Sequence, residues 1–240
     1  MKITVFNGSP HAERSNTNVM AEAFLEGARA VGAEVENIFL AHKKIHSCVA
    51  CYSCWLKTPG QCAVQDDMTE LLPKCQASDI VIFATPLYVD NVTGLMKNFM
   101  DRMIPAADPY FEKDPGGECR HKITSKVPKI MVISNCGFPE QSHFQVLKLL
   151  FRRIARNMNT ELIAEIYRGG GSILSDKSFW LWLPLRHYKA LLRRAGEEVV
   201  TNGGISAELQ RDLEKPLMPE EQYIKGAESF FRKELKKIGR

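Results

Sequence analysis

Four of the seven cysteines lie within one short run whose spacing can ligate a metal centre. Their pattern is Cys48-x2-Cys51-x2-Cys54-x7-Cys62. Thiolates two residues apart in a tight loop can turn toward one centre, and such runs ligate iron-sulfur clusters. Zinc more often takes two separated C-x2-C pairs, so the spacing favours a cluster over zinc, with free thiols as the remaining alternative.

A second candidate site follows the first apolar run of the chain. Residues 8–18 read Gly-Ser-Pro-His-Ala-Glu-Arg-Ser-Asn-Thr-Asn and precede a helical pattern. Hydroxyls and the N–H groups of a helix start can bind a phosphate, but the same residues are typical of an ordinary helix cap. Neither G-x-x-x-x-G-K-[ST] nor G-x-G-x-x-G is present, and a hydroxyl-rich, glycine-poor loop favours a flavin monophosphate.

Two later loops offer groups that suit a planar ring. Pro86-Leu87-Tyr88-Val89 follows the third apolar run, where Pro86 fixes a turn and Tyr88 offers a flat face. Asn135-Cys136-Gly137 follows the fourth run, and Gly137 permits close backbone approach. For any one loop taken alone, a simple connecting turn is the better interpretation. Their joint placement is what points to a site.

The elements between these loops predict one α/β sheet. Five apolar runs, continuous rather than alternating, are typical of strands covered on both faces. They lie at 3–6, 35–40, 79–85, 129–134 and 162–167, and helical patterns at 16–31, 93–103 and 144–158 separate them. This alternation predicts a doubly wound, five-stranded parallel sheet in the order 2-1-3-4-5, with the three loops at its carboxyl edge.

The remaining chain predicts an appendage. We expect a domain over 1–167, with a cysteine-rich insertion at about 44–64, and a helical C-terminal extension over 168–240 that serves packing or an oligomer contact. The Arg-Gly-Gly-Gly run at 168–171 predicts a flexible break. Pro184 is expected to interrupt the amphipathic stripe of the segment that contains it, and 219–237 predicts an amphipathic helix. Asp66 and Asp67 are expected to cap a helix, and Asp101 and Arg102 to form a structural ion pair.

Composition excludes several classes. The chain has 240 residues, 45% hydrophobic and 25% charged, with a formal charge of +4. These values exclude disorder and low complexity, and the charge is too small to imply nucleic acid or a membrane as partner. Because no signal peptide or membrane span is recognisable, we expect a cytoplasmic protein with reduced thiols.

The combined motifs resemble the flavodoxin-like FMN reductases and, within them, the iron-sulfur flavoproteins. The resemblance spans about 1–167 and rests on three blocks: Gly8-Ser9-Pro10 with Ser15-Asn16-Thr17, Thr85-Pro86-Leu87-Tyr88 followed by Lys97 and Asp101-Arg102, and the cysteine run ending at Asp66-Asp67-Met68. It implies FMN, with phosphate at Ser9, Ser15, Asn16 and Thr17 and the ring near Pro86, Leu87, Tyr88, Asn135, Cys136 and Gly137. His11 and Val89 complete the candidate cofactor-binding set. His11 stands where many relatives have Arg, so pairing with the phosphate passes to Arg14 or is weaker.

The resemblance implies an FMN-dependent oxidoreductase or electron-transfer flavoprotein with a 4Fe-4S cluster on Cys48, Cys51, Cys54 and Cys62. Electrons would pass from NAD(P)H or ferredoxin to an acceptor, in a homo-dimer or homo-tetramer. The chemistry demands no side-chain acid or base, so we assign no catalytic residue. The alternatives are a cluster-free reductase of quinones, nitro compounds or free flavin, and a thiol or metal redox-sensing module on a flavodoxin scaffold.

Overall fold

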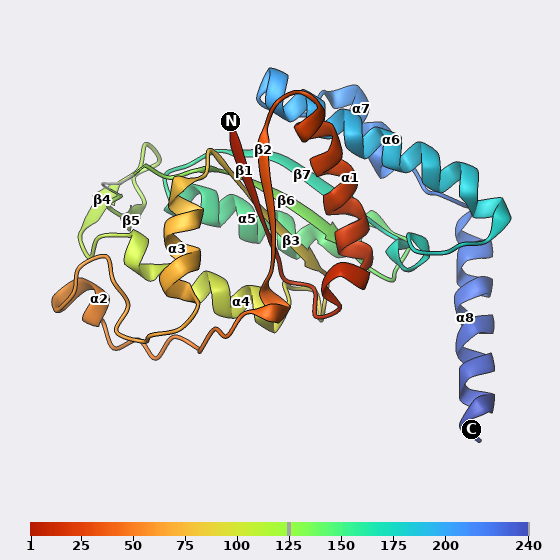
Figure 1. The fold of residues 1–240 in the computed structure, drawn as a ribbon, viewed down its shortest axis with the longest axis horizontal. Coiled ribbons are helices and arrows are strands. Elements are labelled where there is room, and N and C mark those ends of the chain that lie inside the picture. The colour runs from red at the N-terminus through yellow and green to blue at the C-terminus, as the bar shows by residue number, and fades with distance from the viewer. Residues whose placement is uncertain (124–125, 240) are drawn as a thin grey trace.

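The computed structural model describes residues 1–123 and 126–239, and Figure 1 shows a central sheet with helices on both faces. Five parallel strands form this sheet in the order β2-β1-β3-β6-β7. Their bounds are β1 (Lys2–Asn7), β2 (Glu34–Phe39), β3 (Ile80–Pro86), β6 (Lys129–Asn135) and β7 (Leu162–Arg168). The predicted doubly wound α/β architecture and its strand order 2-1-3-4-5 are confirmed.

Alternate side chains of β3 enter two hydrophobic clusters, one on each face of the sheet. Ile80 and Ile82 belong to the first cluster, and Val81 and Phe83 belong to the second. Every residue of β3 is buried. A strand that is covered on both faces needs apolar side chains at successive positions, which explains its continuous apolar run.

Two groups of helices cover the two faces of the sheet. The first cluster includes side chains from α1 (Asn16–Ala30), α6 (Phe179–Asn202) and α7 (Ala207–Glu214). The second includes side chains from α3 (Met68–Ala77), α4 (Gly94–Asp101) and α5 (Gln145–Asn157). The predicted helices at 16–31, 93–103 and 144–158 therefore match α1, α4 and α5 to within a few residues at each end.

Several short elements were not predicted from the sequence. A two-stranded antiparallel hairpin pairs β4 (Phe111–Lys113) with β5 (Cys119–His121), and α2 (Ser53–Leu56) lies in the cysteine run. Short 3-10 turns cover Ala12–Arg14, Leu40–His42, Ile104–Ala106, Gln141–Phe144 and Gly171–Ile173. Each is too short to produce a periodic pattern.

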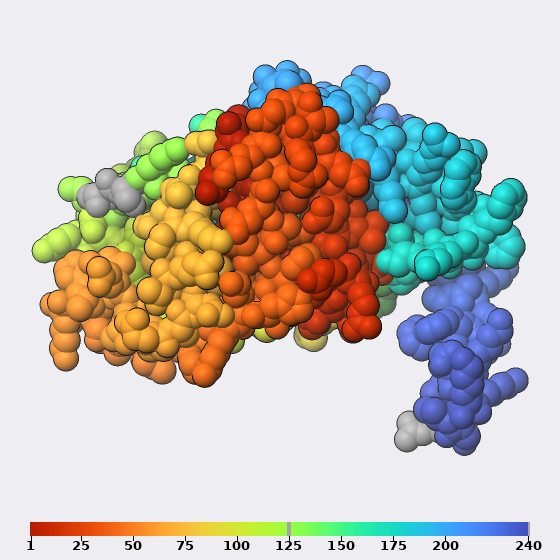
Figure 2. Space-filling view, in the orientation of Figure 1, coloured from red at the N-terminus to blue at the C-terminus, as the bar shows by residue number. Residues whose placement is uncertain are grey.

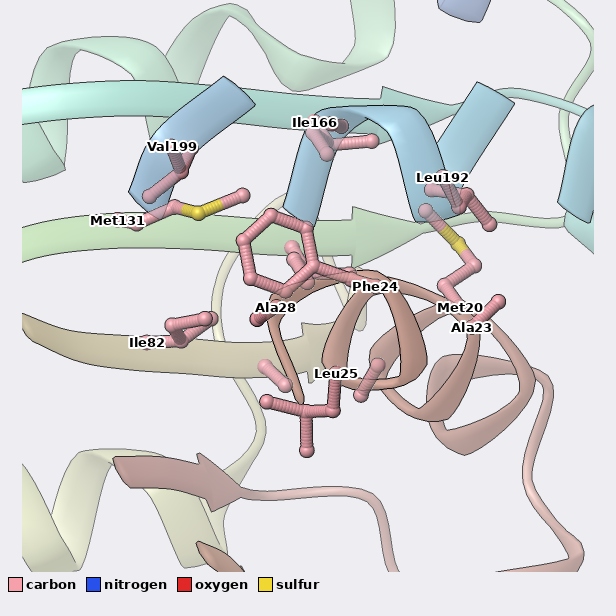
Figure 3. Packing of buried hydrophobic residues seen from close by; sticks show 14 of the residues in the cluster. Met20, Ala23, Phe24, Leu25, Ala28, Ile82, Met131, Ile166, Leu192 and Val199 are labelled. Carbon is pink, nitrogen blue, oxygen red and sulfur yellow. The ribbon is translucent and has the colours of Figure 1, made fainter. Parts of the chain in front are cut away.

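Helix α6 packs closely against α1, as Figure 3 shows for Phe24, Leu192 and Val199. A Cβ added at Gly196 would overlap the Phe24 carbonyl oxygen, and one at Gly27 would overlap the Arg193 carbonyl. Two glycines on facing surfaces thus let the two backbones meet.

Pro184 does not interrupt α6. The helix runs from Phe179 to Asn202 with Pro184 in its second turn. The carbonyl that loses its helical partner to the proline belongs to Trp180, which is 76% exposed, so water can satisfy it. The predicted interruption is therefore wrong, because a proline near an exposed helix start costs little.

The chain ends in α8 (Glu220–Lys237), which projects from the body as a separate arm (Figures 1 and 2). The helical C-terminal extension is thus confirmed. Within residues 1–123 and 126–239, no helix is both long and apolar enough to cross a membrane.

The glycine contact between α1 and α6 predicts a local sensitivity. Gly196→Ala should destabilise the fold by about 1–3 kcal/mol, because the added methyl group must push two helices apart. Gly226→Ala on α8 is the matched control, since nothing lies within 4 Å of a Cβ there. That variant should gain up to about 1 kcal/mol from helix propensity. Urea unfolding measures both changes, and a neutral Gly196→Ala would contradict the close contact.

Candidate functional site

Three loops at the carboxyl ends of β1, β3 and β6 meet at a pocket of about 230 Å³. Eleven of the twelve residues that the sequence predicts for cofactor binding line it. They are Ser9, His11, Ser15, Asn16, Thr17, Pro86, Leu87, Tyr88, Asn135, Cys136 and Gly137. The strands explain this convergence, because parallel strands bring their carboxyl ends to one edge of the sheet.

The chain leaves β1 through a close contact with the start of α4. Thr93, which caps α4, donates its hydroxyl to the Gly8 carbonyl at 2.6 Å and accepts the Met96 N–H. A Cβ on Gly8 would lie 2.8 Å from the Met96 Cβ, so glycine suits this position. The loop that follows is therefore fixed at its first residue.

Ser15 is the N-cap of α1. Its hydroxyl accepts the Asn18 N–H at 3.0 Å and donates to the Ala12 carbonyl at 2.7 Å. The capping interpretation of this serine is thus correct. The cap leaves the hydroxyl oxygen with one lone pair and no proton for a further partner.

The first turn of α1 still offers donors for an anion. Helix geometry leaves the backbone N–H groups of Asn16 and Thr17 without acceptors inside α1, and the positive end of the helix dipole lies there. Both residues line the pocket together with His11 and Arg14. The Thr17 hydroxyl donates to Asn135 Oδ1 at 2.7 Å and so joins this loop to the end of β6.

A glycine run after β7 holds the Asn135–Gly137 loop in place. The Gly170 N–H donates to the Phe138 carbonyl at 2.6 Å, and the Gly171 N–H donates to the Cys136 carbonyl at 2.7 Å. A Cβ at Gly169 would overlap the Pro139 carbonyl oxygen. The predicted flexible break at 168–171 is therefore wrong, because these glycines let two backbones pack against each other.

Tyr88 precedes a tight turn in the loop after β3. The Tyr88 and Asn91 backbones exchange two hydrogen bonds, at 2.9 and 3.1 Å, around Val89 and Asp90. Both central residues have positive φ, 49° and 55°, as a two-residue hairpin turn requires. Val89 is 99% exposed and does not line the pocket, whereas the half-exposed Tyr88 does.

Cys136 is held as a neutral thiol. It is buried, and its Sγ donates to the Phe138 carbonyl at 3.2 Å. Burial raises the pKa of the Cys136 thiol above its usual range. The backbone N–H of Cys136 is also occupied, by the Arg168 carbonyl at 3.1 Å. Among the described residues, the neighbouring Gly137 N–H donates to no protein acceptor and remains available to a ligand.

Two residues of the extension reach this site, and sequence reasoning missed both. Ser172 lines the pocket. Tyr223, in the first turn of α8, donates its hydroxyl to the Gly137 carbonyl at 2.6 Å. The Tyr223 hydroxyl oxygen also lies 2.6 Å from Ser172 Oγ. The glycine run at the end of the last strand is the sequence signal that could have located Ser172. Tyr223 carries no such signal, since it lies 86 residues from its partner.

The cysteine run forms a loop beyond β2 in which four thiols line one small cavity of about 30 Å³. They are the thiols of Cys48, Cys51, Cys54 and Cys62. Cys54 is buried, and burial together with the nearby Cys62, Cys51 and Cys48 raises its pKa. No group of three His, Cys, Asp or Glu side chains in 1–123 and 126–239 is arranged to hold a metal ion. The thiols are thus near one another but not in ligand positions.

Local backbone turns bring the cysteines to this cavity. Ala50 and Tyr52 have φ of 50° and 55°, conformations that are uncommon for residues other than glycine. Each stands next to Cys51. Trp55 in α2 donates its indole N–H to the Ala107 carbonyl at 2.7 Å and so anchors the loop to the segment after α4.

A buried ion pair closes the two ends of the loop. Arg102 donates to Asp66 at 2.6 and 3.0 Å, and both side chains are at most 1% exposed. The same guanidinium donates to the carbonyls of His46 at 2.8 Å and Val64 at 3.2 Å, which lie before the first and after the last of the four cysteines. Arg102 also lines the thiol cavity.

The carboxylate of this pair is strongly acidic. Burial alone would raise the pKa of Asp66, but the Arg102 guanidinium and the His46 and Met68 N–H groups lower it to about 2. The stabilisation that the pair gives is present above about pH 4 and is lost as the pH falls toward 2.

Asp66 and Asp67, expected to cap a helix, have different partners, and Asp101 and Arg102, expected to pair with each other, pair with other residues instead. Asp66 accepts the Met68 N–H at the start of α3, as expected of a cap, while Asp67 accepts the Lys44 N–H at 2.7 Å. Asp101 pairs with the exposed Lys97, whereas Arg102 pairs with Asp66.

A family model described as NADPH-dependent FMN reductase matches residues 1–127. The chain belongs to this FMN reductase family. The matched residues include the loop after β1, the loop after β3 and the cysteine run, so the sequence-based resemblance is confirmed at the level of the family.

The chain is also similar to proteins named iron-sulfur flavoprotein. One from Archaeoglobus fulgidus is 42% identical over 142 residues, which are 59% of this chain and 58% of that protein. A second from the same organism is 39% identical over 102 residues, which are 42% of this chain and 48% of that protein. The chain thus matches about half the length of these relatives.

A solved structure shares the fold. The FMN-dependent NADH-azoreductase from Bacillus anthracis, in complex with FMN, has a TM-score of 0.61 and 16% identity. The match covers 83% of this chain and 99% of that chain. The flavodoxin-like fold is confirmed.

The buried ion pair predicts a large difference between two variants near α4. Arg102→Met leaves the Asp66 carboxylate buried without its cation and should cost about 3–5 kcal/mol of unfolding free energy. Lys97→Met removes the exposed pair with Asp101 and should cost at most about 1 kcal/mol. Urea unfolding followed by circular dichroism measures both, and equal losses would show that Arg102 does not anchor the loop.

Proposed function

We propose that this chain is an NAD(P)H-dependent FMN oxidoreductase that holds FMN in the pocket at the carboxyl ends of β1, β3 and β6. The observation that carries the proposal is that three loops, each predicted separately, line one pocket beside the first turn of α1. Membership of the NADPH-dependent FMN reductase family supports the same cofactor and the same donor.

The residues around the pocket fit both ends of FMN. The N–H groups of Asn16 and Thr17 would bind the phosphate, and His11 and Arg14 add positive charge or further donors beside it. The apolar surfaces of Pro86, Leu87 and Tyr88 would lie against the ring. The unpartnered Gly137 N–H suits a polar atom at the ring edge.

FMN, when bound, supplies the chemistry: it accepts a hydride from NAD(P)H and can release the electrons singly. The chain binds the cofactor, orients it and keeps reactive groups away from it. Cys136 lines the pocket, but burial raises the pKa of its thiol, so it is a poor nucleophile toward a bound flavin. Hydride transfer needs no protein acid or base, so no residue is assigned a catalytic role.

The thiol loop would hold a 4Fe-4S cluster on Cys48, Cys51, Cys54 and Cys62. Thiolates are the ligands that such clusters take, and the four thiols already line one cavity. Arg102 lies beside Cys62, and its charge would offset part of the negative charge of four thiolates. With such a cluster, ferredoxin would be an alternative electron donor. The seven free cysteines suit a reducing, cytoplasmic compartment.

One observation favours a second candidate, a reductase without a cluster. Cys48 and Cys51 are exposed, and the thiols of the described residues are not arranged as ligands. In that case the flavin would pass its electrons directly to a small acceptor such as a quinone, a nitro compound or free flavin.

Phosphate recognition predicts a selective loss of affinity. Arg14→Gln should weaken FMN binding by about tenfold, the value of one charge-assisted hydrogen bond. Riboflavin, which lacks the phosphate, should bind the variant and the unchanged chain equally. Quenching of flavin fluorescence measures both affinities, and Arg29→Gln, at the far end of α1, is the control. An equal loss for both flavins, or none for FMN, would contradict the placement of the phosphate.

Cluster ligation predicts a loss of iron without loss of flavin. Protein purified without oxygen should hold about four iron atoms per chain and absorb broadly beyond the flavin bands. Cys54→Ser should lose the iron and keep FMN, whereas Cys119→Ser, exposed on the β4–β5 hairpin, should keep both. Iron that survives in Cys54→Ser would contradict the ligand set. Flavin without iron in the unchanged chain would support the cluster-free reductase.

A further inference from the structure

Two hydroxyl groups of the C-terminal extension are linked to the Asn135–Gly137 loop. The Tyr223 hydroxyl donates to the Gly137 carbonyl at 2.6 Å, and Ser172 Oγ lies 2.6 Å from the same phenol oxygen. A phenol has one proton, and a carbonyl can only accept. Because the Tyr223 proton goes to Gly137, the contact with Ser172 is attractive only if Ser172 is the donor. The protons therefore point from Ser172 to Tyr223 and from Tyr223 to Gly137.

The surroundings of Tyr223 hold this hydrogen-bonded chain in place. Tyr223 is 7% exposed, and a Cβ at Gly170 would lie 3.3 Å from its ring, so the ring packs on the Gly170 backbone. The Gly170 N–H in turn donates to the Phe138 carbonyl at 2.6 Å. Ser172 lies within the 3-10 turn Gly171–Ile173. Burial raises the pKa of the Tyr223 hydroxyl, which therefore keeps its proton.

The direction of the protons decides what Ser172 offers to a ligand. Its hydroxyl proton is used by Tyr223, so Ser172 Oγ can meet a further partner only as an acceptor. Ser172 is exposed and lines the pocket. On the neighbouring loop, the Gly137 N–H has no protein acceptor among the described residues and is a donor. The corner of the pocket between Gly137 and Ser172 thus presents one acceptor and one donor.

An acceptor together with a donor matches the imide edge of a flavin. That edge carries a single N–H, at N3, between two carbonyl groups, whereas the opposite edge of the ring carries methyl groups. The N3–H suits Ser172 Oγ, and a flanking carbonyl suits the Gly137 N–H. A site that is built to bond an N–H discriminates against an analogue that lacks it, because the acceptor is then left without a partner.

We propose that Ser172 binds the N3–H of the flavin and that Tyr223 is a positioning residue that holds the Ser172 hydroxyl as an acceptor. This inference rests on the proposed function, which places the flavin in the pocket, and adds which edge of the ring faces the Gly137 corner. Both residues lie beyond residues 1–127, which the family model matches, so membership of the family does not assign them. The extension thereby takes part in flavin recognition.

A flavin analogue tests the contact with Ser172. In 3-methyl-FMN a methyl group replaces the N3 proton, so the unchanged chain should bind it about tenfold more weakly than FMN. Ser172→Ala should bind FMN about three- to tenfold more weakly than the unchanged chain and should bind the two flavins almost equally. Ser229→Ala, exposed on α8, is the matched control and should keep both affinities. Quenching of flavin fluorescence measures all of them.

Tyr223→Phe tests the positioning role. The variant keeps the ring on Gly170 but removes the hydroxyl, so the Ser172 proton is free to point toward the flavin. Most of the preference for FMN over 3-methyl-FMN should be lost, although the Tyr223 side chain is itself buried. Adding Ser172→Ala to Tyr223→Phe should cause no greater loss than Ser172→Ala alone, because both changes break one contact. Tyr110→Phe, at an exposed position, is the control, and circular dichroism verifies folding.

The contradicting outcomes separate the two proposals. An unchanged chain that does not bind FMN would contradict the proposed function and, with it, the contact to N3. A chain that binds FMN and 3-methyl-FMN equally would overturn the Ser172 contact while leaving the proposed function intact. The same holds for a Ser172→Ala variant that keeps the preference. A Tyr223→Phe variant with the full preference, or a double variant with a greater loss than Ser172→Ala, would overturn the positioning role.

Discussion

The parallel direction of the five strands is the constraint on which the candidate site depends. Because β1, β3 and β6 point the same way, three loops from distant parts of the sequence end at one edge of the sheet. Parallel strands need covers on both faces, and the helices that cross back between them provide these covers. The same crossovers point the first turn of α1 at the pocket. Burial of the sheet and convergence of the three loops on one pocket are thus two results of one topology.

The thiol loop depends on a different kind of interaction. It lies outside the sheet, and Cys54 is the one buried residue between Cys48 and Cys62, so apolar burial contributes little to its shape. A buried guanidinium that bonds the carbonyls of His46 and Val64 holds the two ends of the loop instead. Such an ion pair contributes little net stability, but its geometry is specific, because an unpaired buried charge is costly. The loop can therefore keep its thiols close before any metal binds.

The sequence predicted most of the sheet and the pocket, since both follow from strong local patterns. Continuous apolar runs such as that of β3 identify strands. Because the strands are parallel, the loops that follow them lie at the same edge of the sheet. Tertiary contacts with no local signature were missed. The run at 169–171 looks flexible by composition but packs closely, and Tyr223 reaches Gly137 from 86 residues away. The partner of Arg102 was also hidden, since Asp66 lies 36 residues earlier in the chain.

An anaerobic titration tests the central claim most directly. The chain is loaded with FMN, freed of unbound flavin by gel filtration, and titrated with NADPH and then, in a separate sample, with NADH while the flavin absorbance is recorded. The account predicts that FMN stays with the protein in stoichiometric amount and that at least one nicotinamide bleaches its absorbance fully. Flavin lost on the column, or bound flavin that neither nucleotide reduces, would contradict it.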